Sequence, residues 1–467
     1  SPAAGAARPQ SLDSPPSALA EYLGFLIVLD GDTLKWRDPD TGDWTPITGS
    51  FTPPTGKRMS FLEANGNLYF TTDAGVYVLD SLDGTPVRSG IPAGLDIRSS
   101  LTGAGGGFFL PDSQVGYRPT FKRTDANENT KQGAPGPQER LTNLTYEVTW
   151  SRAATTATIA QTGHGYATSD VIEVLVSDDS VALPTGSYTI TVTGADAYTI
   201  TVPNAGGLSG DATVGKAFNA TLEVTLPDEL QVGDVLELWR TPLSATASDN
   251  PGDDHRLIQS VTLTSSHLSA GVVTVVDELE DVFFKENLYT NAGLADGGLA
   301  QANARPPLCS HLAFFDTHTF YFDAEQPYNV RFQLISVDDL GTITLTADTT
   351  DETYTADTAE SVNDKEFKVF DDDLLSVNIE RTAKSLVHII NRASALFYAD
   401  YISGFDDAPG QILITKRDLA GTLIEVEADD TDTSAAFTPL LPYPMSTVPA
   451  QAALNFTGAG VRVGDGP

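Results

Sequence analysis

Histidine is the first residue type to consider, because an imidazole can bind a metal ion or move a proton near neutral pH. The chain has six histidines, and His164 lies between Gly163 and Gly165. No second histidine or acidic residue stands at a recognisable ligand spacing from it, so the sequence favours a turn residue. His311 and His318 flank an aromatic segment and would lie on opposite faces of one regular strand. The sequence therefore predicts no histidine metal site.

Three aspartates surround a glycine near the start of the chain, as the oxygen ligands of a calcium ion often do. Asp38, Asp40 and Asp43 enclose Gly42 in the segment DPDTGDW. An EF-hand loop needs a glycine at its sixth position, a glutamate at its twelfth and a helix on each side. Strands are expected on both sides here. A tight turn, in which aspartate oxygens accept backbone N–H groups, explains this pattern better.

Signatures of catalysis are the next feature to test. The 63 acidic residues guarantee that some carboxylate pair has the separation used by glycosidases, so such a pair carries no information. The arginine cluster and repeated aspartate turns of sialidase-like propellers do not occur. A GxSxG elbow, a P-loop, an HExxH motif and a dinucleotide fingerprint are also absent. The glycine run at 103–107 precedes no amphipathic helix that could bind phosphate. We expect no catalytic, cofactor-binding or metal-binding residues.

Composition indicates a globular, strongly acidic protein. The 467 residues are 40% apolar and carry a formal net charge of −36. The basic clusters with which proteins bind nucleic acid are missing. The acidity fits either a salt-adapted organism or a wall past which another polyanion slides. Cys309 is the single cysteine, which excludes an internal disulfide, and we expect a buried thiol.

The ends of the chain and its apolar runs bear on targeting. The longest strongly apolar run, FLIVL at 25–29, is far too short to cross a bilayer, so we expect no membrane segment. The first twenty residues lack the basic and apolar regions of a secretory signal and are typical of a loose arm. The chain has no initial Met and stops soon after an expected strand. We therefore expect it to be part of a longer polypeptide.

Three segments share one design of short strands joined by tight turns. Residues 25–44 and 64–80 each place a glycine-containing turn before a leucine and an aromatic residue, then a second turn and another strand. Residues 310–324 are similar. Three such panels, one of them more than 200 residues from the others, predict propeller blades with other domains inserted between them.

The remaining segments predict inserted domains, so the expected fold is mainly β: a propeller-like body with immunoglobulin-like or β-barrel insertions and one α+β insertion. The expected order is an N-terminal arm with the first meanders (1–100), half of a β-sandwich (101–147), a small β-barrel or sandwich (148–217), the other half of the sandwich (218–290), a further blade (291–337), an α+β unit with an acidic edge (338–437) and a return to the propeller body (438–467).

One helix is predicted with its boundaries, at 376–392. Apolar residues recur on one face at helical spacing, and Arg392 suits the C-terminal end. Ser376 is the expected N-cap. The predicted apolar face consists of Ile379, Ala383, Leu386, Val387 and Ile390. The acidic run Asp371 to Asp373 just before the helix is typical of a solvated edge that stabilises a helix N-terminus, and calcium binding there stays open.

Taken together, these segments resemble a family of tailed-bacteriophage virion proteins, the large tail nozzle or tail-tube proteins built around a propeller. The similar stretches are NLYFTTDAGVYVLD, DANENTKQGAP, ELWRTP with ENLYTN, RPPLCSHLAFFDTHTFYF, and TAKSLVHIINR with YADYISGFDDAPGQI. They cover most of 60–415. The match lies in the pattern of residue types and in the order of the stretches, and it includes no catalytic signature. The stretch TGHGYATSDVIEV resembles a small β module that recurs as an insertion in phage structural proteins.

The resemblance implies a structural component of the virion tail that is not an enzyme. Such nozzles form a ring, usually sixfold, below the portal and head–tail adaptor, and genomic DNA leaves through the ring without specific binding. The implied partners are further copies of the chain, the portal and adaptor proteins, and tail fibres or other tail proteins. No cofactor is implied. The implied location is the virion tail, and the host cytoplasm during assembly.

Two other classes of function stay open on the residues alone. A glycan-binding adhesin, on a virion or a cell surface, would use exposed aromatic and acidic side chains of the β modules. Its first stacking candidates are Trp36, Trp44, Trp150 and Trp239, for which core packing is the competing use. A polysaccharide-degrading enzyme is the third and weaker alternative.

Overall fold

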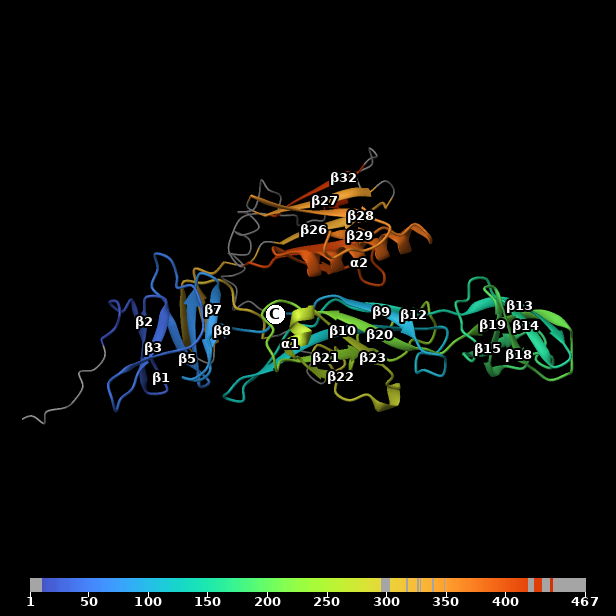
Figure 1. Ribbon diagram of the computed structural model, residues 1–467, viewed down its shortest axis with the longest axis horizontal. Coiled ribbons are helices and arrows are strands. Elements are labelled where there is room, and N and C mark those ends of the chain that lie inside the picture. The colour runs from blue at the N-terminus through green and yellow to red at the C-terminus, as the bar shows by residue number, and fades with distance from the viewer. Residues whose placement is uncertain are drawn as a thin grey trace, which may run out of the picture.

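The computed structural model describes residues 11–294, 303–315, 318–325, 327, 329–337, 340–347, 349–418, 424–430 and 437–439. As expected, the protein is mainly β. Figure 1 shows a group of small sheets at one end, a β-sandwich in the middle, a barrel at the other end and an α+β unit beside the sandwich. Among the described residues, no helix combines the length and the apolar character needed to cross a membrane.

The first unit, called the stack below, consists of two antiparallel meanders and a hairpin. The first meander contains β1 (Ala18–Tyr22), β2 (Phe25–Asp30), β3 (Thr33–Arg37) and β4 (Trp44–Pro46). The second contains β5 (Phe61–Ala64), β6 (Asn67–Thr72), β7 (Gly75–Leu79) and β8 (Val87–Arg88). The hairpin, from much later in the chain, contains β24 (His311–Phe315) and β25 (His318–Phe322). Asn65 and Gly66 connect β5 to β6 with φ of 54° and 76°, which is the two-residue turn that Asn-Gly favours.

The three layers of the stack pack face to face. Leu68 and Phe70 of β6 share an apolar core with Leu34 of the first meander. On the opposite face of the second meander, Val76 packs against Leu312 of β24. The second meander is therefore covered on both faces, with the first meander on one side and the hairpin on the other.

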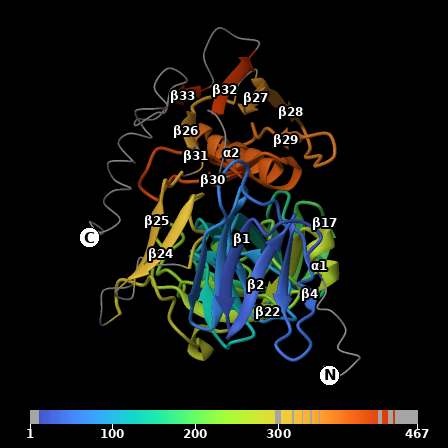
Figure 2. The same cartoon turned by 90° about the vertical axis from the view of Figure 1, so that its left-hand side faces the viewer.

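Face-to-face packing of short antiparallel sheets is also how the blades of a propeller pack. The three expected panels are indeed meanders or hairpins of short strands. A propeller is not established, however, because the layers formed by the described residues do not close into a ring. Figure 2 shows the first meander facing the viewer and the β24–β25 hairpin at the margin of the unit.

Two segments that are far apart in the sequence form the β-sandwich. One sheet has the order β11-β10-β21-β22, with β12 also pairing with β10, and the other has the order β23-β20-β9. The strands are β9 (Ile97–Thr102), β10 (Ser113–Thr124), β11 (Thr130–Gln132), β12 (Glu139–Asn143), β20 (Asn219–Thr225), β21 (Val235–Arg240), β22 (Arg256–Thr262) and β23 (Val272–Asp277). Helix α1 (Ser265–Ala270) and the 3₁₀ turn η1 (Asp281–Phe283) flank β23. Tyr117, Phe121, Leu222 and Leu236 lie in the core between the sheets.

The chain between β12 and β20 forms a separate seven-stranded sheet. Its order is β16-β15-β19-β13-β14-β18-β17, and β16 contacts β18, so the sheet curls into a nearly closed barrel. The strands are β13 (Tyr146–Ala153), β14 (Thr156–Ala160), β15 (Val171–Ser177), β16 (Gly186–Thr189), β17 (Thr191–Gly194), β18 (Ala197–Thr201) and β19 (Ser209–Gly215). Trp150, Tyr198 and Val214 are buried inside it.

The glycine run at 103–107 lies where the barrel joins the sandwich. A side chain at Gly105 would meet the backbone of Val171 at 2.4 Å, and one at Gly107 would meet the carbonyl of Phe218 at 2.1 Å. Asn143 donates to the carbonyl oxygens of Phe109 and Lys216, at 2.8 and 2.9 Å, which joins the two segments that enter and leave the barrel. Glycine is therefore required here for close backbone approach.

The α+β unit contains one long helix and two four-stranded sheets. The sheets have the orders β30-β31-β26-β33 and β29-β28-β27-β32. The elements are β26 (Asn329–Leu334), β27 (Leu340–Ala347), β28 (Thr350–Asp357), β29 (Glu366–Lys368), α2 (Leu375–Ala393), β30 (Phe397–Tyr401), β31 (Gln411–Lys416), β32 (Ile424–Asp430) and β33 (Phe437–Pro439). The first of these sheets contains β26, so the unit begins at Asn329, earlier than the boundary at 338 that the sequence suggested. The expected return to the propeller body at 438–467 lies outside the described residues, apart from the two that end β33.

Helix α2 matches the predicted helix in position and face, but not in its cap. All five residues of the predicted apolar face are buried, and Arg392 lies in the last turn. Ser376 is not the N-cap. The helix begins one residue earlier, after Leu374, which provides no side-chain cap, and Asn378 instead donates to the carbonyl oxygen of Asp373 at 2.8 Å. A side chain inside the first turn thus fixes the segment before the helix.

Candidate functional site

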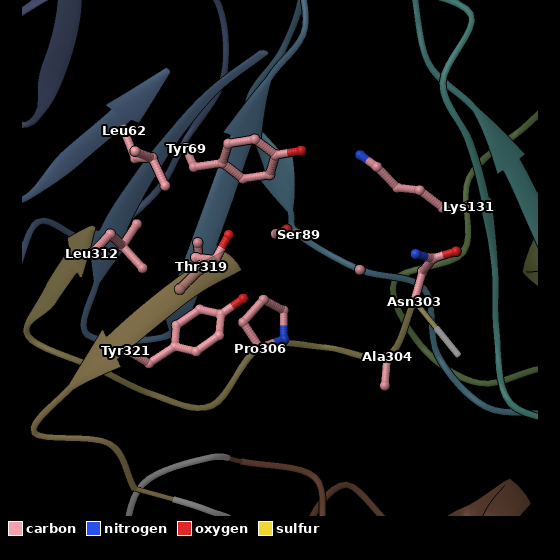
Figure 3. Close-up of a pocket in the computed structure, with 12 residues that line it drawn as sticks. Leu62, Tyr69, Ser89, Lys131, Asn303, Ala304, Pro306, Leu312, Thr319 and Tyr321 are labelled. Atoms are coloured by element: carbon pink, nitrogen blue, oxygen red, sulfur yellow. The ribbon is translucent and has the colours of Figure 1, made fainter. Parts of the chain in front are cut away.

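A cavity of about 280 Å³ lies where the stack meets the sandwich and the segment that leads to β24. Its apolar wall comes from two layers of the stack, with Leu62 on β5 of the second meander and Leu312 on β24 of the hairpin. Figure 3 shows the hydroxyl of Tyr69, the ammonium of Lys131 and the side chain of Asn303 facing the space between these elements. The remaining lining residues are Val76, Ser89, Gly90, Ala304, Pro306, Thr319 and Tyr321.

Lys131 is the one charged side chain among the residues that line this cavity. Burial lowers the pKa of Lys131, and Asp125, whose Oδ2 lies 3.6 Å from Nζ, acts in the opposite direction. The ammonium also lies 6.0 Å from the centre of the Tyr69 ring. Burial raises the pKa of Tyr321, so its hydroxyl stays protonated and can donate. The cavity offers hydrogen-bond donors beside aromatic rings, which suits a ligand rich in hydrogen-bond acceptors, such as a sugar.

Polar side chains join the stack to the sandwich next to this cavity. The tip between β10 and β11, residues 125–129, contacts the Asn-Gly turn of the second meander. The fully buried Asn67 donates to Asp125 Oδ2 at 2.7 Å, and Asn127 Nδ2 lies 2.7 Å from Asn67 Oδ1 and 2.9 Å from the carbonyl oxygen of Gly66. Asn129 donates to the carbonyl oxygen of Asn65 at 3.0 Å. These contacts, called the first joint below, fix the orientation of the two units because hydrogen bonds require specific directions.

Ion pairs join α2 to the sandwich at a second joint. Lys384 Nζ lies 2.8 Å from Glu139 and 3.0 Å from Glu380, and Arg140 lies 3.0 Å from Glu380. Burial acts against the charged form of Lys384, but the two glutamates outweigh it and raise the pKa of the ammonium. A cavity of about 180 Å³ lies beside these groups, between α2 and β9.

A buried histidine of α2 belongs to the same joint. His388 Nδ1 lies 2.8 Å from Asp96 Oδ2, and Asn391 donates to Asp96 Oδ1 at 2.8 Å. An aspartate that orients a histidine occurs in many hydrolases, where the second ring nitrogen faces a nucleophile. Here His388 Nε2 faces the carboxylate of Glu223, at 3.8 Å. The arrangement therefore joins two units and lacks the geometry of a nucleophilic site.

Asp400 is the one carboxyl at this interface whose pKa is raised to near neutrality. Burial, with the charge of Asp96 as the second cause, raises the pKa of Asp400 to about 7. Asp400 lies two residues from Tyr398 on β30, and the Tyr398 hydroxyl accepts the backbone N–H of Asp228 from the sandwich, at 2.9 Å. Both side chains therefore lie on the face of β30 that meets the sandwich.

The structure confirms the turn interpretations of His164 and of the aspartate cluster. Asp38 Oδ1 accepts the backbone N–H groups of Asp40 and Thr41, at 2.8 and 3.2 Å, which is the expected turn. These hydrogen bonds lower the pKa of Asp38. His164 accepts the N–H of Tyr166 at 2.9 Å, in a turn where both flanking glycines have positive φ. Among the described residues, no group of three or more His, Cys, Asp or Glu converges as metal ligands would.

The expectation for His311 and His318 was wrong. They lie on two antiparallel strands, and the register pairs His311 with Phe322 and His318 with Phe315. Both histidines therefore lie on the same face of the hairpin, at opposite ends. Cys309 is buried as expected, and burial raises the pKa of its thiol to about 11.

Three of the four tryptophans pack against other groups, as the competing interpretation held, whereas Trp44 on β4 is half-buried. Trp150 and Trp239 are buried, and their indole N–H groups donate to Asp178 at 3.3 Å and Thr120 at 2.8 Å. Trp36 packs edge to face on Phe25. Asp371 to Asp373 are exposed, as a solvated edge should be, and Asp372 pairs with Arg381 of α2 at 2.6 Å.

Sequence reasoning missed the two joints and the lining of the cavity. Asn67 and Asp125 lie 58 residues apart, and Asp96 and His388 lie 292 apart. No local spacing rule connects such pairs. The turn-forming residues of the segment DANENT, 125–130, are the one local signal of this tip.

Removing the buried amide of the first joint should destabilise it. For Asn67→Ala we expect the free energy of unfolding of the stack to fall by about 1 to 3 kcal/mol, because Asp125 loses a donor and Asn127 an acceptor. Hydrogen exchange at β6 and at the tip 125–129 measures this. Asn250→Ala, in an exposed turn of the sandwich, is the control. A loss no larger than that of the control would show that the joint contributes nothing.

Asp400 should make the second joint weaken as pH rises. Its carboxyl titrates near pH 4 when unfolded and at about 7 when folded. The folded state therefore binds the proton more tightly, so this stabilisation is complete below pH 4 and is lost as pH rises through 7. We expect Asp400→Asn to raise the free energy of unfolding at pH 8 by on the order of 2 kcal/mol and to change it little at pH 4. Urea unfolding at both pH values tests this, and an equal effect at both would contradict it.

Comparisons with known proteins identify no family. No family model and no curated protein matches the chain. Among solved structures, it is similar to the N-terminal domain of Nup159, with 10% identity and a TM-score of 0.13 over 64% of this chain and 70% of that one. It is also similar to the phage phi92 endosialidase, with 12% identity and a TM-score of 0.15 over 88% of this chain and 64% of that one.

Proposed function

We propose that the chain is a structural protein of a tailed-bacteriophage virion that forms part of the tail nozzle or tube below the portal and adaptor. The observation that carries this proposal is the way in which the β units are joined. Directed polar contacts at two joints, rather than flexible linkers, connect the stack and the α+β unit to one central sandwich. Units connected in this way keep their relative orientation, which a wall around a passage requires.

Ion pairs also hold the segment that returns from the sandwich to the stack. Arg305 Nε lies 2.9 Å from Glu229 Oε2, and Arg88 of β8 pairs with the same carboxylate. Arg417 of the α+β unit donates to the carbonyl oxygen of Asn391 at 2.8 Å and also pairs with Asp228. Residues 228 and 229 of the sandwich thus contact both neighbouring units. The two ion pairs of Glu229 are partly buried, so salt screens them less than it screens exposed pairs.

The charge of the chain supports a role beside DNA without binding to it. A net charge of −36 repels phosphate groups, and the repulsion acts over about 8 Å at physiological ionic strength. DNA would pass such a surface without being held. A ring of identical subunits in head-to-tail contact would enclose the passage. The partners in this proposal are further copies of the chain, the portal and adaptor proteins, and tail fibres or other tail proteins.

Electron microscopy of the purified chain and of the virion tests this proposal. We expect a closed ring of subunits with an acidic central channel, located below the portal. A chain that stays monomeric at virion-like local concentrations, or a channel lined by Lys and Arg, would contradict it.

The cavity beside the first joint favours a second candidate, a glycan-binding adhesin. Tyr69, Tyr321, Lys131 and Asn303 offer aromatic surfaces and donors in a space of about 280 Å³. A glycan array with the full chain distinguishes the two candidates. A channel wall predicts no binding, whereas an adhesin predicts binding that Tyr321→Ala reduces at least about tenfold and the exposed control Leu208→Ala leaves unchanged.

A further inference from the structure

Residues 226–230 of the sandwich, called the clamp loop below, follow strand β20 and lie between the two neighbouring units. Leu226 and Leu230, at its ends, are buried in the core of the sandwich. Asp228 and Glu229 point out of that core, with side chains that are 62% and 24% exposed. The core therefore fixes both ends of the clamp loop, and only its tip can change conformation without disturbing the sandwich.

Glu229 has a left-handed backbone that contacts from outside the loop stabilise. Its φ is 72°, a conformation that costs free energy for any residue other than glycine. Its carboxylate lies 2.9 Å from Arg305 Nε and pairs with Arg88 of the stack, and its carbonyl oxygen accepts from Arg123 of β10 at 2.9 Å. These contacts offset the cost of the conformation. Two of the three arginines belong to the stack and to the segment that returns to it, so the conformation depends on the docked stack.

Asp228, the preceding residue, contacts the α+β unit. Its backbone N–H donates to the hydroxyl of Tyr398 on β30 at 2.9 Å, and its carboxylate lies 2.5 Å from Arg417 Nη1, just after β31. The guanidinium of Arg417 also lies 4.1 Å from the centre of the Tyr398 ring, so the two partners of Asp228 support each other. Consecutive residues of the clamp loop thus contact two different units.

The backbone of the clamp loop connects these two sets of contacts. Without its arginine partners, Glu229 would favour an ordinary conformation with negative φ. Since both ends of the loop are fixed, residues beside Glu229 must then rotate to compensate. Pro227 contributes little, because its ring fixes φ. Asp228 takes most of the rotation, which turns its N–H away from Tyr398. The tip therefore has two discrete arrangements, and only the left-handed one suits the α+β unit.

We propose that the clamp loop couples the docking of the stack to the docking of the α+β unit. While the stack is docked, Arg88 and Arg305 hold Glu229 in the left-handed form, and Asp228 then meets Tyr398. When the stack undocks, Glu229 relaxes and the α+β unit loses this contact. Thermodynamic linkage makes the effect reciprocal. The coupling goes beyond the proposed function and does not rest on it, because a rigid wall requires only that both units stay docked.

Thiol labelling of Thr225→Cys in the full chain tests the coupling. Thr225 is 1% exposed and shares a face of β20 with Glu223, which faces His388 of α2, so a thiol there reacts when the α+β unit undocks. We expect Arg88→Gln, in the stack, to speed labelling at least about fivefold. Arg37→Gln, at an exposed arginine of the first meander, is the matched control and should leave the rate unchanged.

A second background shows whether the effect passes through Asp228. Tyr398→Phe with Asp228→Asn removes the hydroxyl that accepts the N–H and the charge that meets Arg417. In this background Arg88→Gln should change the labelling rate by less than about twofold. Peptide mapping separates the label at position 225 from any label at Cys309. Equal acceleration in both backgrounds, or none in the chain with both residues intact, would overturn the proposal.

Two substitutions at Glu229 test the role of its conformation. Glu229→Gln removes the charge and keeps the cost of the left-handed backbone, so it should speed labelling at least about fivefold. Glu229→Gly removes the charge as well, but glycine adopts the left-handed form without help, so its effect should be smaller. An effect of Glu229→Gly as large as that of Glu229→Gln would show that the ion pairs alone act, and the two-state loop would be wrong.

Discussion

The stack depends on a simple constraint: a sheet of short strands has two faces and cannot bury either one alone. A four-stranded meander with strands of three to six residues, like those that begin this chain, offers too little apolar surface to fold by itself. Neighbours must cover it. The second meander meets this requirement on both sides, with Leu68 and Phe70 in one core and Val76 in another. The hairpin that completes the second core comes from more than 200 residues later, so the stack forms only after the intervening domains have been synthesised.

The connections between the units obey a different rule from the interiors of the units. Each interior is apolar, with its own cluster of buried side chains. The two joints are polar, built from Asn67 and Asp125 at one and from Asp96, His388 and Lys384 at the other. Polar joints give little net free energy, since desolvation offsets much of the attraction. They define geometry instead, because each donor must meet a particular acceptor. The units can therefore fold separately and then dock in one orientation.

Local patterns in the sequence predicted the local structure well. The spacing of Ile379, Leu386 and Ile390 identified the buried face of α2, and Asn65-Gly66 identified a hairpin turn. The mainly β class followed from alternation alone. The cap of α2 was missed because Asn378 acts from within the first turn, which a rule for the position before the helix does not consider. The faces of His311 and His318 were missed because the two residues lie on paired antiparallel strands and not on one continuous strand.

The joints could not be predicted, for a physical reason. A hydrogen bond between residues 58 or 292 positions apart depends on how whole domains meet, and single-sequence periodicity contains no such information. The same applies to the cavity, whose lining comes from the second meander, the sandwich and the hairpin together. The acidic composition could be interpreted from the sequence, because net charge does not depend on the fold.

The barrel has a consequence for how this chain can change over time. Its first and last strands are direct neighbours, with Tyr146 opposite Val214, so the chain enters and leaves the barrel at one place. Asn143, at the end of the segment that enters the barrel, donates to the carbonyl oxygen of Lys216 in the segment that leaves it and to that of Phe109 in the sandwich. Recombination could therefore replace the whole module by another of different surface while the sandwich kept its fold. A lineage could thus change the binding surface at this end of the protein while the other units stay the same.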